Sequence, residues 1–230
     1  MRSIWRTLTP SLQRDMVAMA GAIAVIGLSF GAIAVASGLD WWMPTVMSVL
    51  VFAGGSQFMV VGVVAAGGGL VAAVVGALVL NARHLPFGLA VGDMMGRGKV
   101  ARLVGAHLLI DESVAFAMAQ KDPARARAVF WFLGTTAFVV WNIGTIVGAA
   151  AGQVIGDSDA FGLDAAFPAG LLALVLPALK NTRTRNAALL GAAVAVATTP
   201  FLPAGVPVLL ALVGLVALIP APEKKEEVPA

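Results

Sequence analysis

The chain contains no cysteine and no tyrosine, and only two of its 230 residues are histidine. Without cysteine it cannot form disulfide bonds, thiolate metal sites or a cysteine nucleophile. Charge is also scarce, because Asp, Glu, Lys and Arg together make up 12% of the residues. The sequence has no dense basic patch of the kind that binds nucleic acid. It also has no phosphate-binding loop, metal-ligand cluster or hydrolase triad. These absences argue against an enzyme and predict no cofactor, no metal site and no nucleic-acid partner.

Hydrophobic residues, by contrast, make up 60% of the chain, and the mean hydropathy is +0.94. A soluble domain with one core cannot bury that much apolar surface. A membrane-crossing helix needs about 20 apolar residues. Four runs without Asp, Glu, Lys, Arg or His are long enough for at least one crossing each: Met16–Gly38, Trp41–Leu80, Val129–Gly156 and Asn186–Ala221. The sequence therefore predicts an all-α polytopic membrane protein.

The two ends of the chain differ from this apolar body. In residues 1–15, an apolar stripe (Ile4, Trp5, Leu8 and Leu12) alternates with Arg2, Arg6 and Arg14. This pattern predicts a short helix lying on the membrane surface. Residues 16–220 are expected to form one transmembrane transport domain. The charged tail, residues 221–230, is expected to be disordered and cytoplasmic.

Seven or eight spans are expected. Seven predicted helices are Met16–Ser37, Trp41–Ala66, Leu70–Asp93, Ala128–Ile155, Ala165–Leu179, Thr184–Thr199 and Val206–Ile219. An eighth segment, Val100–Ala119, is ambiguous because it carries Arg102, His107, Asp111 and Glu112. If it crosses, most Lys and Arg residues fall on one side, which favours eight spans with both termini cytoplasmic. The alternative is seven spans, with this segment interfacial or re-entrant.

An internal repeat is also predicted. Gly38–Gly54 aligns with Gly162–Ala178 at an offset of 124 residues, with Gly-Leu-Asp and a later Pro in both. Upstream, Gly27/Gly31 and Gly144/Gly148 supply a GxxxG spacing, which permits close helix contact. The candidate repeat halves are residues 16–120 and 128–220, an organisation that many secondary transporters show. The alternative is chance similarity among apolar segments.

Two predicted spans carry a break near the middle. Trp41–Ala66 contains Gly54, Gly55, Ser56 and Gln57. Paired glycines weaken a helix, and Ser and Gln can bond the freed backbone groups. An unwound segment here would point a half-helix N-terminus at an anionic group. The alternative is a notch for close helix packing.

The second break lies in Leu70–Asp93, where Asn81, Arg83, His84 and Pro86 interrupt the apolar run. An Arg at mid-membrane costs about 2.5–3.5 kcal/mol on insertion scales, and Pro86 disrupts the helix. Arg83 is suited either to grip a substrate carboxylate or to pair with an internal acid. His84 either passes protons or is structural. Asn81 is grouped with them as a substrate-binding candidate.

Further polar groups lie in later apolar segments. Asp111 and Glu112 lie inside an apolar stretch, and His107 lies four residues before Asp111, on the same predicted helix face. If this segment is buried, one carboxylate neutralises Arg83 and desolvation keeps the other protonated. If it is interfacial, both acids simply face water. Asn142 and Thr145 also lie in mid-span and are candidates either for the site or for hydrogen bonds between helices.

Three motifs, FAGGSQFMVVGVVAAG, NARHLPFG and LIDESVAFA, occur in this order and spacing. With them the chain resembles the AzlC family of branched-chain amino-acid permeases. The resemblance implies export of leucine, isoleucine and valine, with methionine as a further substrate. It implies a location in the plasma (inner) membrane of a prokaryote. It also implies a complex with a separate small membrane protein of the AzlD type.

Residues and resemblance together predict a secondary transporter. Arg83 and a helix N-terminus at Gly55–Gln57 suit an amino-acid carboxylate. Asp111 or Glu112 suits the ammonium group or a coupling proton. Since no nucleotide site is present, the expected energy source is an ion gradient, most simply of protons. The alternative is a membrane subunit or passive channel for other small solutes.

Overall fold

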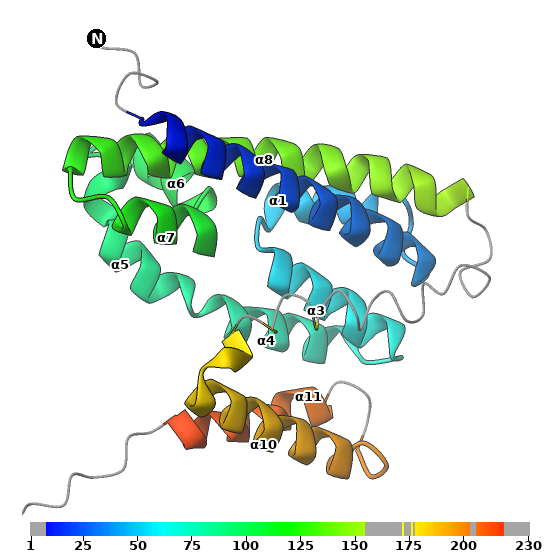
Figure 1. The fold of residues 1–230 in the computed structure, drawn as a ribbon. Helices are drawn as coiled ribbons and strands as arrows, with labels where there is room; N and C mark the ends of the chain where they lie inside the picture. Colours follow the sequence, from blue (N-terminus) through cyan, green and yellow to red (C-terminus); the bar gives the residue numbers. More distant parts are fainter. Residues whose placement is uncertain (1–7, 155–171, 173–175, 177, 203–205, 219–230) are drawn as a thin grey trace, which may run out of the picture.

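The structure is a computed structural model that describes residues 8–154, 172, 176, 178–202 and 206–218. Within these ranges the chain is all-helical, as the sequence predicts (Figure 1). Ten α-helices and two 3-10 helices lie there: α1 (Pro10–Ala36), α2 (Met43–Leu50), α3 (Gly54–Ala65), α4 (Leu70–Asn81), α5 (His84–Met95), α6 (Lys99–His107), α7 (Asp111–Met118), α8 (Pro123–Val154), η3 (Ala178–Lys180), α10 (Thr182–Thr198), α11 (Val206–Leu210) and η4 (Ala211–Leu218).

The two long helices, α1 and α8, lie side by side and run in the same direction (Figure 1). The two GxxxG spacings face one another across this contact. A Cβ atom added at Gly27 would lie 2.7 Å from the carbonyl oxygen of Trp141, and one at Gly31 would overlap the backbone of Thr145. The glycines therefore allow the two backbones to touch. Both helices are long and apolar enough to cross a membrane.

α4 and α5 together form a third candidate span, bent by 46° at the junction of the two helices. The pair runs back from the C-terminal ends of α1 and α8 to their N-terminal ends (Figure 1). There Trp131 Nε1 donates a hydrogen bond to the carbonyl oxygen of Met94 (3.1 Å). The predicted break is present. Pro86 lies in the first turn of α5, where helix N–H groups have no partner within the helix and a proline is tolerated.

α2 and α3 form a hairpin in place of one continuous span. α2 ends at Leu50, residues 51–53 are non-helical, and α3 returns toward the end of the molecule where α2 began (Figure 1). At the tip, the Phe52 ring lies 5.1 Å from the ring of Phe138, midway along α8. A break is present, but at residues 51–53; Gly54, Gly55, Ser56 and Gln57, where the unwinding was expected, form the first turn of α3. The predicted single crossing over Trp41–Ala66 is wrong, because packing against α8 reverses the chain.

The ambiguous segment forms a second hairpin, which enters from the opposite end. Before α6, a Cβ atom at Gly96 would lie 2.9 Å from Nη2 of Arg127, near the start of α8. The non-helical tip, Leu108–Ile110, reaches Gly134, and α7 ends at Met118, close to the beginning of α8. Both ends of the hairpin thus lie near the N-terminus of α8. This geometry favours the re-entrant alternative and does not show the crossing.

This hairpin corrects two further expectations. His107 ends α6 and Asp111 begins α7, so the two do not share one helix face. The basic residues flanking the hairpin also lie at one end of the molecule instead of on opposite sides. That end carries Arg14, Arg97, Lys99, Arg102, Lys121, Arg125 and Arg127. The loops at the other end, residues 37–42 and 66–69, contain no Lys or Arg.

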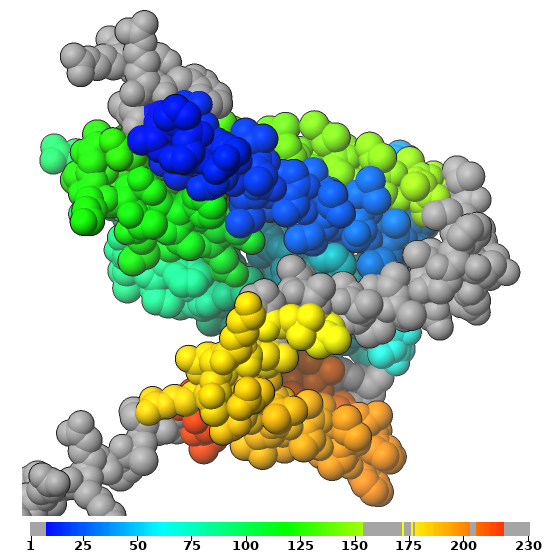
Figure 2. Space-filling view, viewed as in Figure 1, coloured from blue at the N-terminus to red at the C-terminus, as the bar shows by residue number. Residues whose placement is uncertain are grey.

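The C-terminal helices pack mainly on one another, below the rest of the molecule in Figures 1 and 2. A Cβ atom at Gly191 would lie 2.6 Å from the carbonyl oxygen of Ala211 in η4. α11 contacts α4. Most of the second copy of the candidate repeat, residues 162–178, and the tail lie outside the described residues. Residues 10–15 form the first turns of α1 without a boundary, and residues 1–7 are not described, so the predicted surface helix and the other domain limits stay predictions.

Candidate functional site

The two hairpin tips meet halfway along α8 and enclose a cavity of about 340 Å³. The Phe52 and His107 rings, one from each hairpin, lie 6.5 Å apart. The α4–α5 junction closes a third side with Arg83 and His84. The cavity is lined by Ile23, Ile26, Phe52, Ala53, Gly54, Gly55, Phe58, Leu80, Arg83, His84, Ile110, Asp111, Glu112 and Trp141.

Arg83 connects these elements. Its Nη1 lies 3.2 Å from Oδ2 of Asp111, forming an ion pair between the α4–α5 junction and the first residue of α7. A Cβ atom at Gly55 would lie 3.3 Å from Arg83 Nη2, so the guanidinium also covers the start of α3. The predicted pairing of Arg83 with an acid is therefore present, and Asp111 is the partner.

Each partner of this ion pair keeps one hydrogen-bonding atom that makes no hydrogen bond within the described part of the chain. Arg83 Nε and Asp111 Oδ1 are buried and have no hydrogen-bond partner among the described residues. The two side chains as a whole are 38% and 44% exposed, so they face the open cavity. Because a guanidinium and a carboxylate can bond through two parallel N–H groups, the single contact leaves capacity on both groups for a ligand.

Helices α3, α5 and α7 start at the cavity. The first N–H groups of a helix have no acceptor inside it and carry a partial positive charge. α3 begins with Gly54 and Gly55, and Ser56 Oγ donates back to the carbonyl oxygen of Ala53 (2.9 Å). Gln57 is 1% exposed, and neither atom of its side-chain amide has a partner among the described residues. The predicted half-helix N-terminus is thus present, with Gly54 and Gly55 in the cavity wall and Ser56 and Gln57 outside it.

α7 begins with two acids, Asp111 and Glu112, a favourable arrangement at a helix N-terminus. Ser113 fixes this start, because its Oγ accepts from the N–H of Ile110 (3.1 Å) and lies 2.9 Å from that residue's carbonyl oxygen. Both carboxylates line the cavity. The alternative in which they only face water at the interface does not match this placement.

His84 and Asn81 lie at the edge of the site. Nδ1 of His84 is 3.0 Å from the carbonyl oxygen of Asn81, which the broken helix leaves available. Asn81 Oδ1 is buried without a partner among the described residues. Both residues line a second cavity, and only His84 also lines the central one.

Asn142 and Thr145 are not in the cavity wall. Asn142 Nδ2 donates to the carbonyl oxygen of Phe138 one turn earlier (2.8 Å). Thr145 Oγ1 lies 3.4 Å from Ser48 Oγ, a buried contact that joins α8 to α2. Thr145 therefore matches the alternative of a hydrogen bond between helices, whereas Asn142 bonds only within α8 and its Oδ1 is buried without a partner among the described residues.

An aromatic wall was not predicted from the sequence. Trp141 stacks on Phe30 with centroids 5.8 Å apart and meets the edge of Phe58 at 6.4 Å. The Trp141 ring occupies the space that a side chain at Gly54 would fill, 2.8 Å from its Cβ position. The only sequence signal was a Trp beside Asn142 at mid-span, which does not reveal which helix it faces.

The fold and the site together define a helical membrane protein. Its central cavity lies where helices are interrupted and contains an ion pair. The chain belongs to the AzlC protein family, whose model matches residues 18–155. This is a family of transporters and not of enzymes. The matched range includes both hairpins, the α4–α5 junction and α8.

Two relatives extend the comparison. A protein of Bacillus subtilis (strain 168) described as "Branched-chain amino acid transport protein AzlC" is 24% identical over 235 residues, covering 98% of this chain and 90% of the relative. An uncharacterized membrane protein of Helicobacter pylori (strain ATCC 700392 / 26695) is 26% identical over 174 residues, covering 75% of this chain and 76% of the relative. No solved structure matches the chain.

Proposed function

We propose that this protein is a secondary transporter that exports leucine, isoleucine and valine, with methionine as a further substrate, in exchange for protons. The observation that carries the proposal is the Arg83–Asp111 ion pair, which lies in the cavity where α3 and α7 begin and leaves Arg83 Nε and Asp111 Oδ1 without a partner among the described residues. The Bacillus subtilis relative supplies the substrate class by its description. The cavity's volume of about 340 Å³ falls in the range of small-molecule sites.

The cavity offers a separate place for each part of an amino acid. The carboxylate lies against Arg83 and the first N–H groups of α3, at Gly54 and Gly55. The ammonium group lies against Asp111 or Glu112. The aliphatic side chain packs on the apolar wall that includes Ile23, Ile26 and Trp141. We also assign substrate binding to Gln57 and Asn81, because the side-chain amide oxygen of each lies close by and has no partner among the described residues. Their contacts with the substrate form when the cavity closes.

Coupling to protons falls to the titratable groups beside the substrate. Glu112 lines the cavity but makes no ion pair with the described residues, so it is available to carry a proton. His84, which also lines the cavity, is proposed as a second carrier. A protonated Glu112 in one state and a bare carboxylate in the other would link proton entry to substrate release.

The distribution of charge suggests an orientation. Cytoplasmic loops carry an excess of Lys and Arg. The protein is proposed to lie in the inner membrane of a prokaryote. The end of the molecule that carries Arg97, Lys99, Lys121 and Arg125 then faces the cytoplasm. α1, α4–α5 and α8 then cross, the two hairpins are re-entrant, and further crossings after residue 155 return the C-terminus to the cytoplasm.

A small membrane protein of the AzlD type is the proposed partner, in keeping with the family resemblance. The side chains of Leu78, Leu85 and Leu89 on α4 and α5 are 65%, 73% and 87% exposed, so this pair offers apolar surface to lipid or to a partner helix.

Counterflow of labelled leucine in proteoliposomes tests the function. Vesicles preloaded with unlabelled leucine should transiently accumulate the label, because a transporter exchanges one substrate for another across its alternating site. A passive channel equilibrates the label without accumulation. A non-transporting subunit gives no protein-dependent flux, including when the AzlD-type partner is reconstituted with it. Either of the last two results would refute the proposal.

A further inference from the structure

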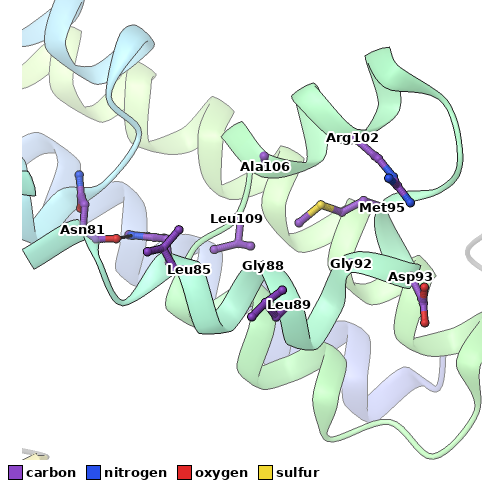
Figure 3. A pocket seen from close by; sticks show the side chains of 11 residues that line it. Asn81, Leu85, Gly88, Leu89, Gly92, Asp93, Met95, Arg102, Ala106 and Leu109 are labelled. Carbon is purple, nitrogen blue, oxygen red and sulfur yellow. Dashed lines mark hydrogen bonds between the residues drawn. The ribbon is translucent and has the colours of Figure 1, made fainter.

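A second cavity, of about 530 Å³, lies between α5 and α6 (Figure 3). It extends from the α4–α5 junction, where Asn81 lies, to the end of the molecule that carries the basic residues, where Asp93 and Arg102 lie (Figure 3). The floor along α5 includes Gly88 and Gly92, which have no side chains to fill it. We call this cavity the α5–α6 groove.

The groove presents opposite charges on its two walls. Asp93 is on α5 and Arg102 is on α6, at the same end of the groove (Figure 3). No ion pair joins them within the described part of the chain. Arg102 is oriented by its Nε, which donates to the carbonyl oxygen of Gly96 (3.2 Å). A cation and a separate anion at one mouth match a ligand that carries both charges close together.

The remainder of the groove is apolar. Leu85, Met95, Ala106 and Leu109 line it between the charged mouth and the α4–α5 junction. Its inner end reaches His84, which also lines the central cavity. A ligand with a zwitterionic head and an aliphatic tail would leave no charge in the apolar part and would point its tail toward the central site.

We propose that the α5–α6 groove is a second, loading site for a zwitterionic aliphatic amino acid, with Arg102 receiving the carboxylate and Asp93 the ammonium group. The inference rests on the proposed function, since the basic end must face the substrate supply. The open groove takes up the amino acid, and His84 separates it from the central cavity, where Arg83 and Asp111 hold it next.

The first test measures the apparent KM for leucine presented on the basic side of proteoliposomes. Arg102→Gln and Asp93→Asn should each raise KM by about tenfold to a hundredfold, the scale of a lost hydrogen bond to a charged group. The maximal rate should be largely retained, because uniform binding is lost. Arg97→Gln and Asp15→Asn, at the same end but outside the groove, are the matched controls and should leave KM unchanged.

Half-charged analogues assign the roles. Isocaproate, which lacks the ammonium group, should lose inhibitory potency in Arg102→Gln but not in Asp93→Asn. Isoamylamine, which lacks the carboxylate, should show the reverse. If both variants keep the wild-type KM, or match their controls, the loading site is refuted. If the wild type itself shows no leucine counterflow, it is the proposed function that fails.

A labelling experiment is independent of transport rates. A cysteine at Ala106, which lines the groove, should react with an impermeant thiol reagent from the basic side, and leucine should slow the reaction. A cysteine at Val100, on the same helix but outside the groove and 75% exposed, should react equally with and without leucine. No labelling at Ala106→Cys, or no protection by leucine, would overturn the proposal.

Discussion

At the scale of single residues, Arg83 holds the site together. Placing a guanidinium in mid-membrane costs about 2.5–3.5 kcal/mol on insertion scales. Such a group is therefore found where bonding partners offset the free energy lost on removing it from water. Here the partners are one oxygen of Asp111 and the start of α3, and Nε remains unpartnered among the described residues. A residue this costly and this incompletely bonded is suited to binding a carboxylate that comes and goes.

Arg83→Lys should fold and insert but bind leucine more weakly, because Lys keeps the charge and loses the planar fork. The expected loss is about 1.5–3 kcal/mol, or tenfold to a hundredfold in affinity. Binding by titration and thermal unfolding of the same preparation measure this. Unchanged affinity in a well-folded Arg83→Lys variant would make Arg83 a purely structural ion. In that case Arg83→Ala should be rescued by adding Asp111→Asn.

Gln57→Leu should raise the unfolding temperature of the substrate-free protein. A buried amide without hydrogen-bond partners destabilises the folded protein by about 1–3 kcal/mol. The side chain of Leu is similar in size to that of Gln and has no polar group to satisfy. If Gln57 bonds the substrate when the cavity closes, added leucine should stabilise the variant less than the wild type. Differential scanning fluorimetry with and without leucine gives both quantities. A fall in the substrate-free unfolding temperature would show that Gln57 has a partner in the resting protein.

Glu112→Gln should make leucine export insensitive to pH while leucine binding persists. The amide resembles a protonated carboxyl group and cannot release its proton, so a coupling step through Glu112 is lost. Initial export rates across a range of pH, compared with wild type, measure the effect. An unaltered pH profile would assign coupling to another group, with His84 the next to substitute.

At the scale of elements, the parallel contact of α1 and α8 supports both hairpins. The tips pack against α8 at Gly134, Phe138 and Trp141, so the position of α8 sets where the tips meet. α8 is in turn held by backbone contact with α1 at Gly31 and Gly148. A change in the spacing of α1 and α8 at Gly31 would therefore shift Trp141 of the cavity wall, which lies one helical turn from the contact.

Gly31→Ala should destabilise the protein by about 1–3 kcal/mol, because the new methyl group overlaps the backbone of Thr145 and forces the helices apart. Gly21→Ala, on the same helix with nothing within 4 Å of the added Cβ position, is the control. It should be neutral or stabilising by up to about 1 kcal/mol, since Ala favours the helix. Thermal unfolding of the two variants compares them. Equal effects at the two positions would mean that the α1–α8 contact is looser than described.

At the scale of the whole molecule, the candidate spans α1, α4–α5 and α8 and the two hairpins place the N-termini of α3 and α7 at the central cavity. Half-helices that end at mid-membrane expose backbone groups, which is tolerated only where they line a polar cavity. The arrangement also places Arg14, Arg97, Lys99, Arg102, Lys121, Arg125 and Arg127 at one end. The proposed carboxylate site and the proposed orientation therefore depend on the same topology.

Cysteines introduced into this cysteine-free chain test the topology. Gly98→Cys and Lys121→Cys, on either side of the α6–α7 hairpin, should both be shielded from an impermeant thiol reagent in intact cells and react after permeabilisation. Gly69→Cys, in the loop between α3 and α4, should react in intact cells. A segment that crosses would put Gly98 and Lys121 on opposite sides, so labelling of only one of them in intact cells would disprove the hairpin.

The sequence alone predicts the helical membrane class, a break close to Gly54 and another at Arg83, and an acid near residue 111 as one candidate partner of Arg83. These follow from local properties: hydropathy, glycine and proline, and the cost of an unpaired charge. The tertiary structure is needed to see that the chain turns back after residues 51–53 and continues, with a bend, after Arg83. It chose Asp111 as the ion-pair partner, removed Asn142 and Thr145 from the cavity wall, and added Trp141 to it. Hydropathy measures how much apolar surface a segment has and not its direction, which here depends on packing against α8 by residues distant in the sequence.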